Sequence, residues 1–328
     1  MHSTNYPQLI LSQSEAAIKI DDFVQEILYS PGLAYKVDSN SNSNSNSDEE
    51  INPRLKHYAR YLRAMVDVFN GWTDYDFSEH LELFNDTRLE IRLEDLDSHF
   101  TCPAPDDSFR FLSEAECINL LVERIRENSR SIRYLRGTRD RAYESKMQTR
   151  DLGEYVSGVM SRYARTLVVR VNLYYRGVSK PWLRAEDVFA ARNRLAGQIG
   201  RNEVFEHLSG YVLRIEQADR QGFHIHAAFF FNASEVQNEA YRAKKIGELW
   251  IKVTHGKGFW HDSGRAWLSK HGRGGQRTTG VFKRTDTDAC FRVARYMSYL
   301  AKTSQYLRIK PENGRAYSTG QLPRGRGF

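Results

Sequence analysis

A chain of 328 residues with 40% hydrophobic and 12% aromatic residues has ample material for a folded core, so a disordered or fibrous protein is excluded. Its formal net charge of +7 favours a polyanionic partner, either nucleic acid or an acidic membrane surface. Neither the first residues nor any later window has the pattern of a signal peptide or the apolar length of a membrane span. We therefore expect a soluble, cytoplasmic protein with no membrane partner.

The first half of the sequence predicts helices and a linker. Residues 1–37 contain one amphipathic helix, over residues 15–30, and residues 38–51, with the run "DSNSNSNSNSDEE", predict a flexible linker. Residues 52–160 form a mostly helical region that begins at Asn52 and Pro53, a helix cap followed by a proline in the first turn. Ser113 and Glu116 have the spacing of a capping box, which predicts a further helix start. No chemistry is evident in this half.

The second half, residues 161–328, alternates strand and helix patterns. "TLVVRVNLYY" from Thr166 has the period of two that is typical of a strand, and residues 210–218 and 223–231 predict two more strands around the turn "DRQG". Helices are expected over "AEDVFAARNRLAGQI", from a capping box at Ser234 and Gln237 to about residue 253, and over "RVARYMSYLAKT". "VFKR" predicts a short strand. We expect an α+β domain, an antiparallel sheet of about five strands with helices on one face.

Two histidines in the third strand indicate a metal site. His224 and His226 project from the same face of a strand, because side chains two apart share a face. If Ala218 pairs with Gly222, Glu216 lies directly across from His224 on that face. Two imidazoles and a carboxylate suit magnesium, manganese or zinc, of which we expect magnesium or manganese. The alternative is that each histidine is only a hydrogen-bonded core or surface residue. His255, His261 and His271 could add ligands, but they are interpreted as loop residues.

The basic residues are concentrated at the C-terminal end. From His271 to Phe328 there are twelve Lys or Arg residues against three acids, so this segment carries about +9. On a helix, Arg292, Arg295, Tyr296, Tyr299 and Lys302 share one face, which suits a phosphate backbone. The other interpretation is an ordinary solvated face with tyrosines at the edge of the core.

The histidine pair and the basic helix together predict phosphoryl-transfer chemistry. A metal can polarise a phosphate while a tyrosine oxygen attacks phosphorus to give a covalent phosphotyrosine. Because an ordinary tyrosine hydroxyl is a weak nucleophile, the metal or Lys302 has to activate it. Tyr299 and Lys302 are therefore the candidate catalytic residues.

These motifs resemble those of the HUH nucleases, a superfamily of rolling-circle replication initiators and relaxases. His224-Ile225-His226 is similar to the two histidines that flank a hydrophobic residue, and Tyr299 to Lys302 is similar to the family's Tyr-x-x-Lys. More narrowly, "LVVRVNLYY", "GFHIHAAFFF", "IGELWIKV" and "YLAKTSQYLRIK" resemble the inovirus-type gene-two replication proteins of prophages and integrated elements. The resemblance covers roughly half the chain, from about Thr166 onwards.

The resemblance implies an enzyme that nicks and joins single-stranded or locally melted DNA at a replication origin and leaves a free 3′ hydroxyl for a host polymerase. His224 and His226 would be metal ligands, with Glu216 as a third, and Tyr299 the nucleophile. Two-tyrosine relatives would have their first nucleophile at Arg295, so a single nucleophile is expected, with Tyr296 and Tyr306 as alternatives. A host helicase is a further expected partner. The residues expected to contact DNA are Arg273, Arg277, Arg292, Arg295, Tyr296 and Arg308.

Two other functions fit the same residues. One is a DNA-binding regulator on the same sheet that lacks catalysis. The other is a metallohydrolase for small phosphate esters, or an RNA nuclease, in which Tyr299 is only structural.

Overall fold

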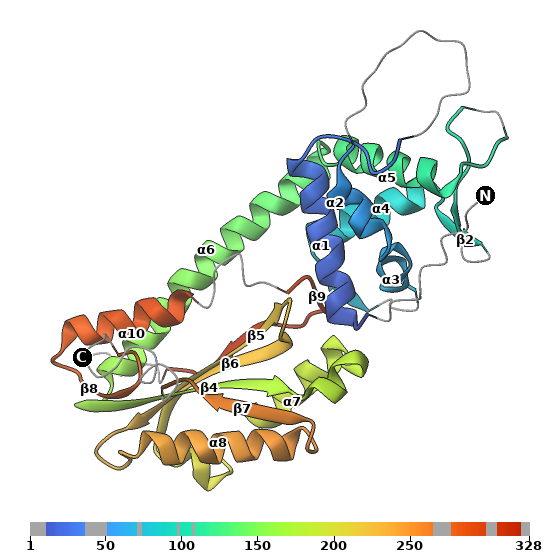
Figure 1. The fold of residues 1–328 in the computed structure, drawn as a ribbon. Helices are drawn as coiled ribbons and strands as arrows, with labels where there is room; N and C mark the ends of the chain where they lie inside the picture. Colours follow the sequence, from blue (N-terminus) through green and yellow to red (C-terminus); the bar gives the residue numbers. More distant parts are fainter. Residues whose placement is uncertain are drawn as a thin grey trace. The chain divides into compact units, whose positions relative to one another are not determined.

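The computed structural model describes residues 11–36, 51–70, 74–96, 99–106, 109–264, 277–299 and 307–322. The chain forms two compact units, Met1–Asp140 and Arg141–Phe328 (Figure 1). Their boundary lies within the long helix α6 (Ile132–Ser161), earlier than the boundary expected after residue 160. Apart from Ile51, the predicted linker over residues 38–51 lies outside the described residues.

The first unit is mostly helical, as predicted. Capping boxes begin two of its helices: Ser12 and Glu15 bond each other's backbone N–H at the first helix, and Ser113 and Glu116 do the same at a later one. The buried rings of Phe23 and Phe84 pack edge to face in its core. The elements of this unit before α6 are α1 (Gln13–Tyr29), α2 (Pro53–Ala59), α3 (Leu62–Asp67), β1 (Tyr75–Phe77), α4 (Glu79–Glu90), β2 (Glu94–Leu96), β3 (His99–Thr101) and α5 (Glu114–Asn128).

The second unit is built on a six-stranded antiparallel sheet, so the predicted α+β class is confirmed. The strand order is β10-β5-β6-β4-β7, and β8 pairs with the first residues of β4. The three long strands were all predicted, whereas β7 and β10 were not. The strands of the sheet are β4 (Arg165–Tyr175), β5 (Leu208–Ala218), β6 (Gly222–Asn232), β7 (Gly258–Asp262), β8 (Gly280–Lys283) and β10 (Tyr317–Thr319).

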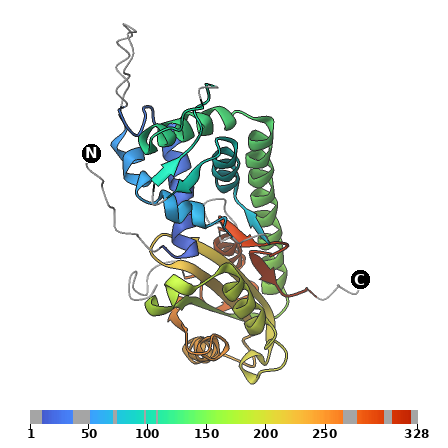
Figure 2. The same cartoon turned by 90° about the vertical axis from the view of Figure 1, so that its right-hand side faces the viewer.

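Helices pack on both faces of this sheet, not on one as expected. On one face lie α7 (Ala185–Ala196) and α8 (Glu239–Val253), where Trp250 packs on Tyr175. On the other face, the end of α6 and α10 (Thr287–Tyr299) form a core with the strands that includes Val168 and Phe230. In both views the sheet separates α8 from α10 (Figure 2). The remaining short elements are η1 (Gly177–Trp182), η2 (Glu203–Phe205) and β9 (Ile309–Pro311).

Helices α6 and α10 pack against one end of the sheet face that they cover. Their core includes Val168, Val212 and Ala228 from the three central strands. The next residues on this face of the strands are polar, among them Asn172 and His226, and are paired with each other. The sheet therefore presents polar side chains beyond the helices, on the face that carries the predicted metal ligands.

Helix α8 begins later than predicted. Asn238, not Ser234, is its cap residue, and its side chain accepts a hydrogen bond from the backbone of Tyr241. Among the described helices, none combines the length and the apolar composition that crossing a bilayer requires.

Candidate metal centre

The β5–β6 hairpin determines which side chains meet at the centre. Gly222 follows the turn with a φ of 64°, a left-handed conformation that favours glycine. Ala218 pairs with Gly222, and this register pairs Glu216 with His224. Because the strand period is two, His226 points to the same face as His224. The predicted convergence of Glu216, His224 and His226 is confirmed.

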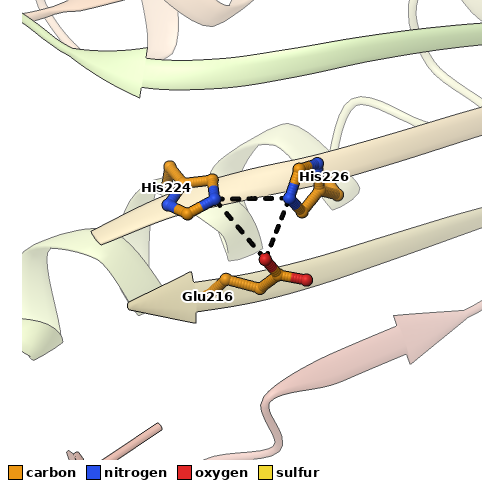
Figure 3. A group of neighbouring side chains, drawn as sticks. All are labelled: Glu216, His224 and His226. Atoms are coloured by element: carbon orange, nitrogen blue, oxygen red, sulfur yellow. Dashed lines mark hydrogen bonds and ion pairs between the residues drawn. The ribbon is translucent and has the colours of Figure 1, made fainter. Parts of the chain in front are cut away.

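Three ligand atoms form a tight triangle at this point (Figure 3). The Oε2 atom of Glu216 lies 2.9 Å from Nε2 of His226 and 3.5 Å from Nε2 of His224, and the two Nε2 atoms are 3.3 Å apart. Ligands bonded at about 2.1 Å to Mg²⁺ or Zn²⁺ would be separated by about 3.0–3.4 Å. The triangle therefore has the dimensions of one face of a divalent-metal coordination shell, and it could hold a metal ion.

Hydrogen bonds at the far side of each ring orient the two imidazoles. The Nδ1 atom of His224 lies 3.1 Å from the carbonyl oxygen of Gly222, and that of His226 lies 2.7 Å from Oδ1 of Asn172. Since these oxygens accept, the Nδ1 atoms donate to them. Each Nε2 faces Glu216, as a donor to the carboxylate while it carries a proton and as a metal ligand when it does not. Such outer contacts are typical of histidines that bind metals.

The charges of the triad favour a cation between the three groups. Burial opposes ionisation of Glu216, but hydrogen bonds with His224 and His226 outweigh it and lower the pKa of the carboxyl to about 2. Burial also lowers the pKa of His226, so protonating both nitrogens of this ring is disfavoured. Without protons on the two Nε2 atoms, the carboxylate and two imidazole lone pairs at these separations would be stabilised by a shared cation. The site opens at His226, whose side chain is 19% exposed against 6% for His224.

The predicted helix face is exposed as expected. On α10, Val293 and Met297 are buried, whereas Tyr296 is 40% and Tyr299 50% exposed. The ring of Tyr296 lies over Arg170, whose guanidinium carbon is 4.2 Å from the ring centroid. Arg295 and Arg277 are also exposed, whereas Arg292 is half-buried.

Other predicted residues are placed differently or lie outside the described part. The backbone N–H and a guanidinium N–H of Arg308 bond Gln217 on β5, so this side chain is anchored to the sheet. Lys302, Arg273, Tyr306 and His271 lie outside the described residues. His261, interpreted as a loop residue, belongs to strand β7.

Sequence reasoning missed the residues that support the ligands. Arg170, Asn172 and Tyr174 follow each other at intervals of two residues on β4, so the sequence pattern already showed that they share one face of the strand. Their position beside the histidines depends on the pairing of Asn172 with His226, and no local turn defines that register. Tyr174 stacks on His224 with ring centroids 5.4 Å apart and forms a hydrogen bond with Asn172.

Comparison with protein-family models, with curated proteins and with solved structures gives no match for this chain. The residues of the site are therefore the basis for assigning a function.

Proposed function

We propose that this chain is a metal-dependent enzyme that nicks and joins single-stranded origin DNA through a covalent phosphotyrosine. In this proposal it initiates rolling-circle replication of a phage, prophage or mobile element, as its resemblance to the inovirus-type gene-two replication proteins implies. The observation that carries the proposal is the triangle of Glu216, His224 and His226, which opens at His226 on the sheet face that also packs against the tyrosine-bearing helix α10.

The packing of α10 supports Tyr299 as the nucleophile. The helix follows β8, which pairs with the first residues of β4, and Tyr296 farther along lies over Arg170. Arg170 is followed two residues later by Asn172, the hydrogen-bond partner of His226. Helix α10 thus runs along β4 in the direction of the metal centre, and Tyr299 lies about one turn beyond Tyr296.

The chemistry requires no oxidation or reduction. When bound, a divalent cation supplies Lewis acidity at a phosphate oxygen and stabilises the charge that develops there. The oxygen of Tyr299 forms a bond to phosphorus, and the bond from phosphorus to the 3′ oxygen of the preceding nucleotide breaks. The phenol gives up its proton and the departing oxygen gains one, which yields a 5′ phosphotyrosine and a free 3′ hydroxyl. Lys302 is proposed to assist this transfer.

Cations around the centre are suited to a phosphate backbone. On α10, Arg295 is exposed and Arg292 is half-buried. Arg170 and Arg214 are buried on β4 and β5 at 8% and 2% exposure, on the face that carries the triad. Guanidinium groups next to a phosphate would offset its charge and fix its orientation.

A covalent-adduct assay tests the proposal. The protein is incubated with fluorescent single-stranded oligonucleotides of randomised sequence and Mn²⁺, and SDS-resistant protein–DNA adducts are quantified. We expect an adduct with the wild type that EDTA abolishes and that falls at least about 100-fold in Tyr299→Phe, because its nucleophilic oxygen is gone. DNA binding by that variant should persist.

Matched variants separate the alternatives. Tyr296→Phe should keep the adduct and His226→Ala should lose it. An undiminished adduct in Tyr299→Phe would remove Tyr299 from the mechanism. Cleavage that survives every tyrosine substitution but not His226→Ala would identify a metallohydrolase, and binding without any cleavage would identify a regulator.

A further inference from the structure

Three aromatic rings form a row across three adjacent strands, starting at the metal centre. The ring of His224 on β6 is stacked on Tyr174 of β4, with centroids 5.4 Å apart and an interplanar angle of 17°. Tyr174 is in turn stacked on Phe259 of β7, at 5.2 Å and 23°. The register that pairs Tyr174 with Phe259 puts both side chains on the same face of the sheet.

Within the described residues, the row ends at the last strand of the sheet. Strand β7 is the last strand in the order of the sheet, and Phe259 is only partly buried. In the described part of the chain, the rings that contact Phe259 are those of Tyr174 and His261. His261 is exposed and meets both rings edge-on, so it borders the row without covering the outer face of Phe259.

We propose that Phe259, with His261 at its edge, is a stacking site for a nucleobase of the DNA strand whose phosphate lies at the metal centre. A base placed on the outer face of Phe259 would be the fourth ring of the row. This inference rests on the proposed function, because it assumes a nucleic-acid strand as the substrate.

The chemistry of the rings favours a base over other occupants. Every nucleobase has a flat π-face, and stacking on an aromatic side chain contributes to the binding of single strands with little dependence on sequence. Phe259 offers no donor or acceptor that would select one base, whereas the imidazole of His261 can bond a base edge. The row also connects the proposed base site to the metal centre, because Tyr174 lies between Phe259 and His224, one of the residues that would hold the metal.

Two oligomers and one substitution test the stacking site. Fluorescence anisotropy is used to measure the binding of a 15-mer of deoxythymidine and of an abasic 15-mer with the same backbone, both in Mg²⁺. Phe259→Leu should weaken binding of the thymidine oligomer about tenfold, because one base–aromatic stack is lost. Binding of the abasic oligomer should not change, whereas a general loss of structure would weaken both.

Two further variants are controls. Phe259→Trp should restore tight binding, since it keeps an aromatic face. Tyr241→Leu removes an exposed ring from α8, on the opposite side of the sheet, and should leave both affinities unchanged. Equal binding of the thymidine oligomer by Phe259→Leu and the wild type would overturn the stacking site.

A crosslink on the wild-type protein gives a result that does not depend on a variant folding. A thymidine 15-mer that carries 5-iodouracil is irradiated in the complex, and the crosslinked peptide is located by mass spectrometry. Attachment at Phe259 or His261 supports the proposal, and attachment only elsewhere contradicts it. Because neither measurement uses cleavage, stacking can be found without a covalent adduct, or an adduct without stacking, so the two proposals can fail separately.

Discussion

Asn172 is the residue through which the sheet orients one of the candidate metal ligands, His226. Its Oδ1 atom accepts from Nδ1 of His226, and its side chain also bonds the hydroxyl of Tyr174, which stacks on the other histidine. One amide thus fixes the ring of His226 directly and that of His224 through Tyr174. Such support lowers the cost of ordering the ligands when a cation binds.

Removing this support should weaken the metal centre without unfolding the protein. Asn172→Ala should reduce the affinity for Mn²⁺ about 10- to 100-fold, as measured by isothermal titration calorimetry. Asn172→Asp keeps an acceptor for Nδ1 of His226 and should bind nearly as well as the wild type. If the alanine variant binds Mn²⁺ with wild-type affinity, the hydrogen bond has no role in ligand orientation.

At the scale of elements, the hairpin of β5 and β6 carries all three ligands. The alternating residue pattern of its strands and the turn between them could be recognised in the sequence. Glu216, His224 and His226 could therefore be predicted from one continuous segment. Asn172 is 54 residues from His226 in the chain, and strand β7 is also joined to β4 by a long connection. Registers between distant strands depend on packing of the whole sheet, which is why Asn172 and Phe259 could not be found from local pattern.

The turn of this hairpin is a testable part of the centre. Gly222→Ala should destabilise the protein by about 1–2 kcal/mol in urea unfolding, because alanine is strained at a φ of 64°. It should also lower Mn²⁺ affinity, since the carbonyl of Gly222 holds Nδ1 of His224. Gly177→Ala is the matched control: a Cβ there would meet nothing within 4 Å, so little change is expected. Equal stability of the two variants would contradict this account of the turn.

The start of α5 should make stability depend on pH. Bonds from the hydroxyl and backbone N–H of Ser113, and then from Arg110, lower the pKa of Glu116 to about 2, against an ordinary value of 4.5. A carboxyl with a lowered pKa stabilises the fold above its unfolded pKa, and this contribution is lost as pH falls from about 4.5 to about 2. The unfolding free energies of the wild type and Glu116→Gln should therefore differ more at pH 6 than at pH 3.5 in urea titrations. A difference that grows on acidification would reverse this interpretation.

At the scale of the whole molecule, the two units differ in their architecture and in the functional groups that they carry. The described part of the first unit is a helical core with capped helices. The second unit combines an antiparallel sheet, a cluster of side chains that could hold a metal ion and a basic, tyrosine-bearing helix. The alternation of strand and helix patterns was enough to predict its class. The sequence could not show that helices cover both faces, because α6 belongs partly to each unit and its packing partners are distant in the chain.

The most direct test of the central claim is electron paramagnetic resonance of the protein titrated with Mn²⁺. We predict one tightly bound Mn²⁺ per chain, with electron spin echo modulation from imidazole nitrogen, and loss of both in a variant carrying His224→Ala and His226→Ala. A Mn²⁺ ion that shows no nitrogen coupling, or that binds the double variant as it binds the wild type, would contradict it.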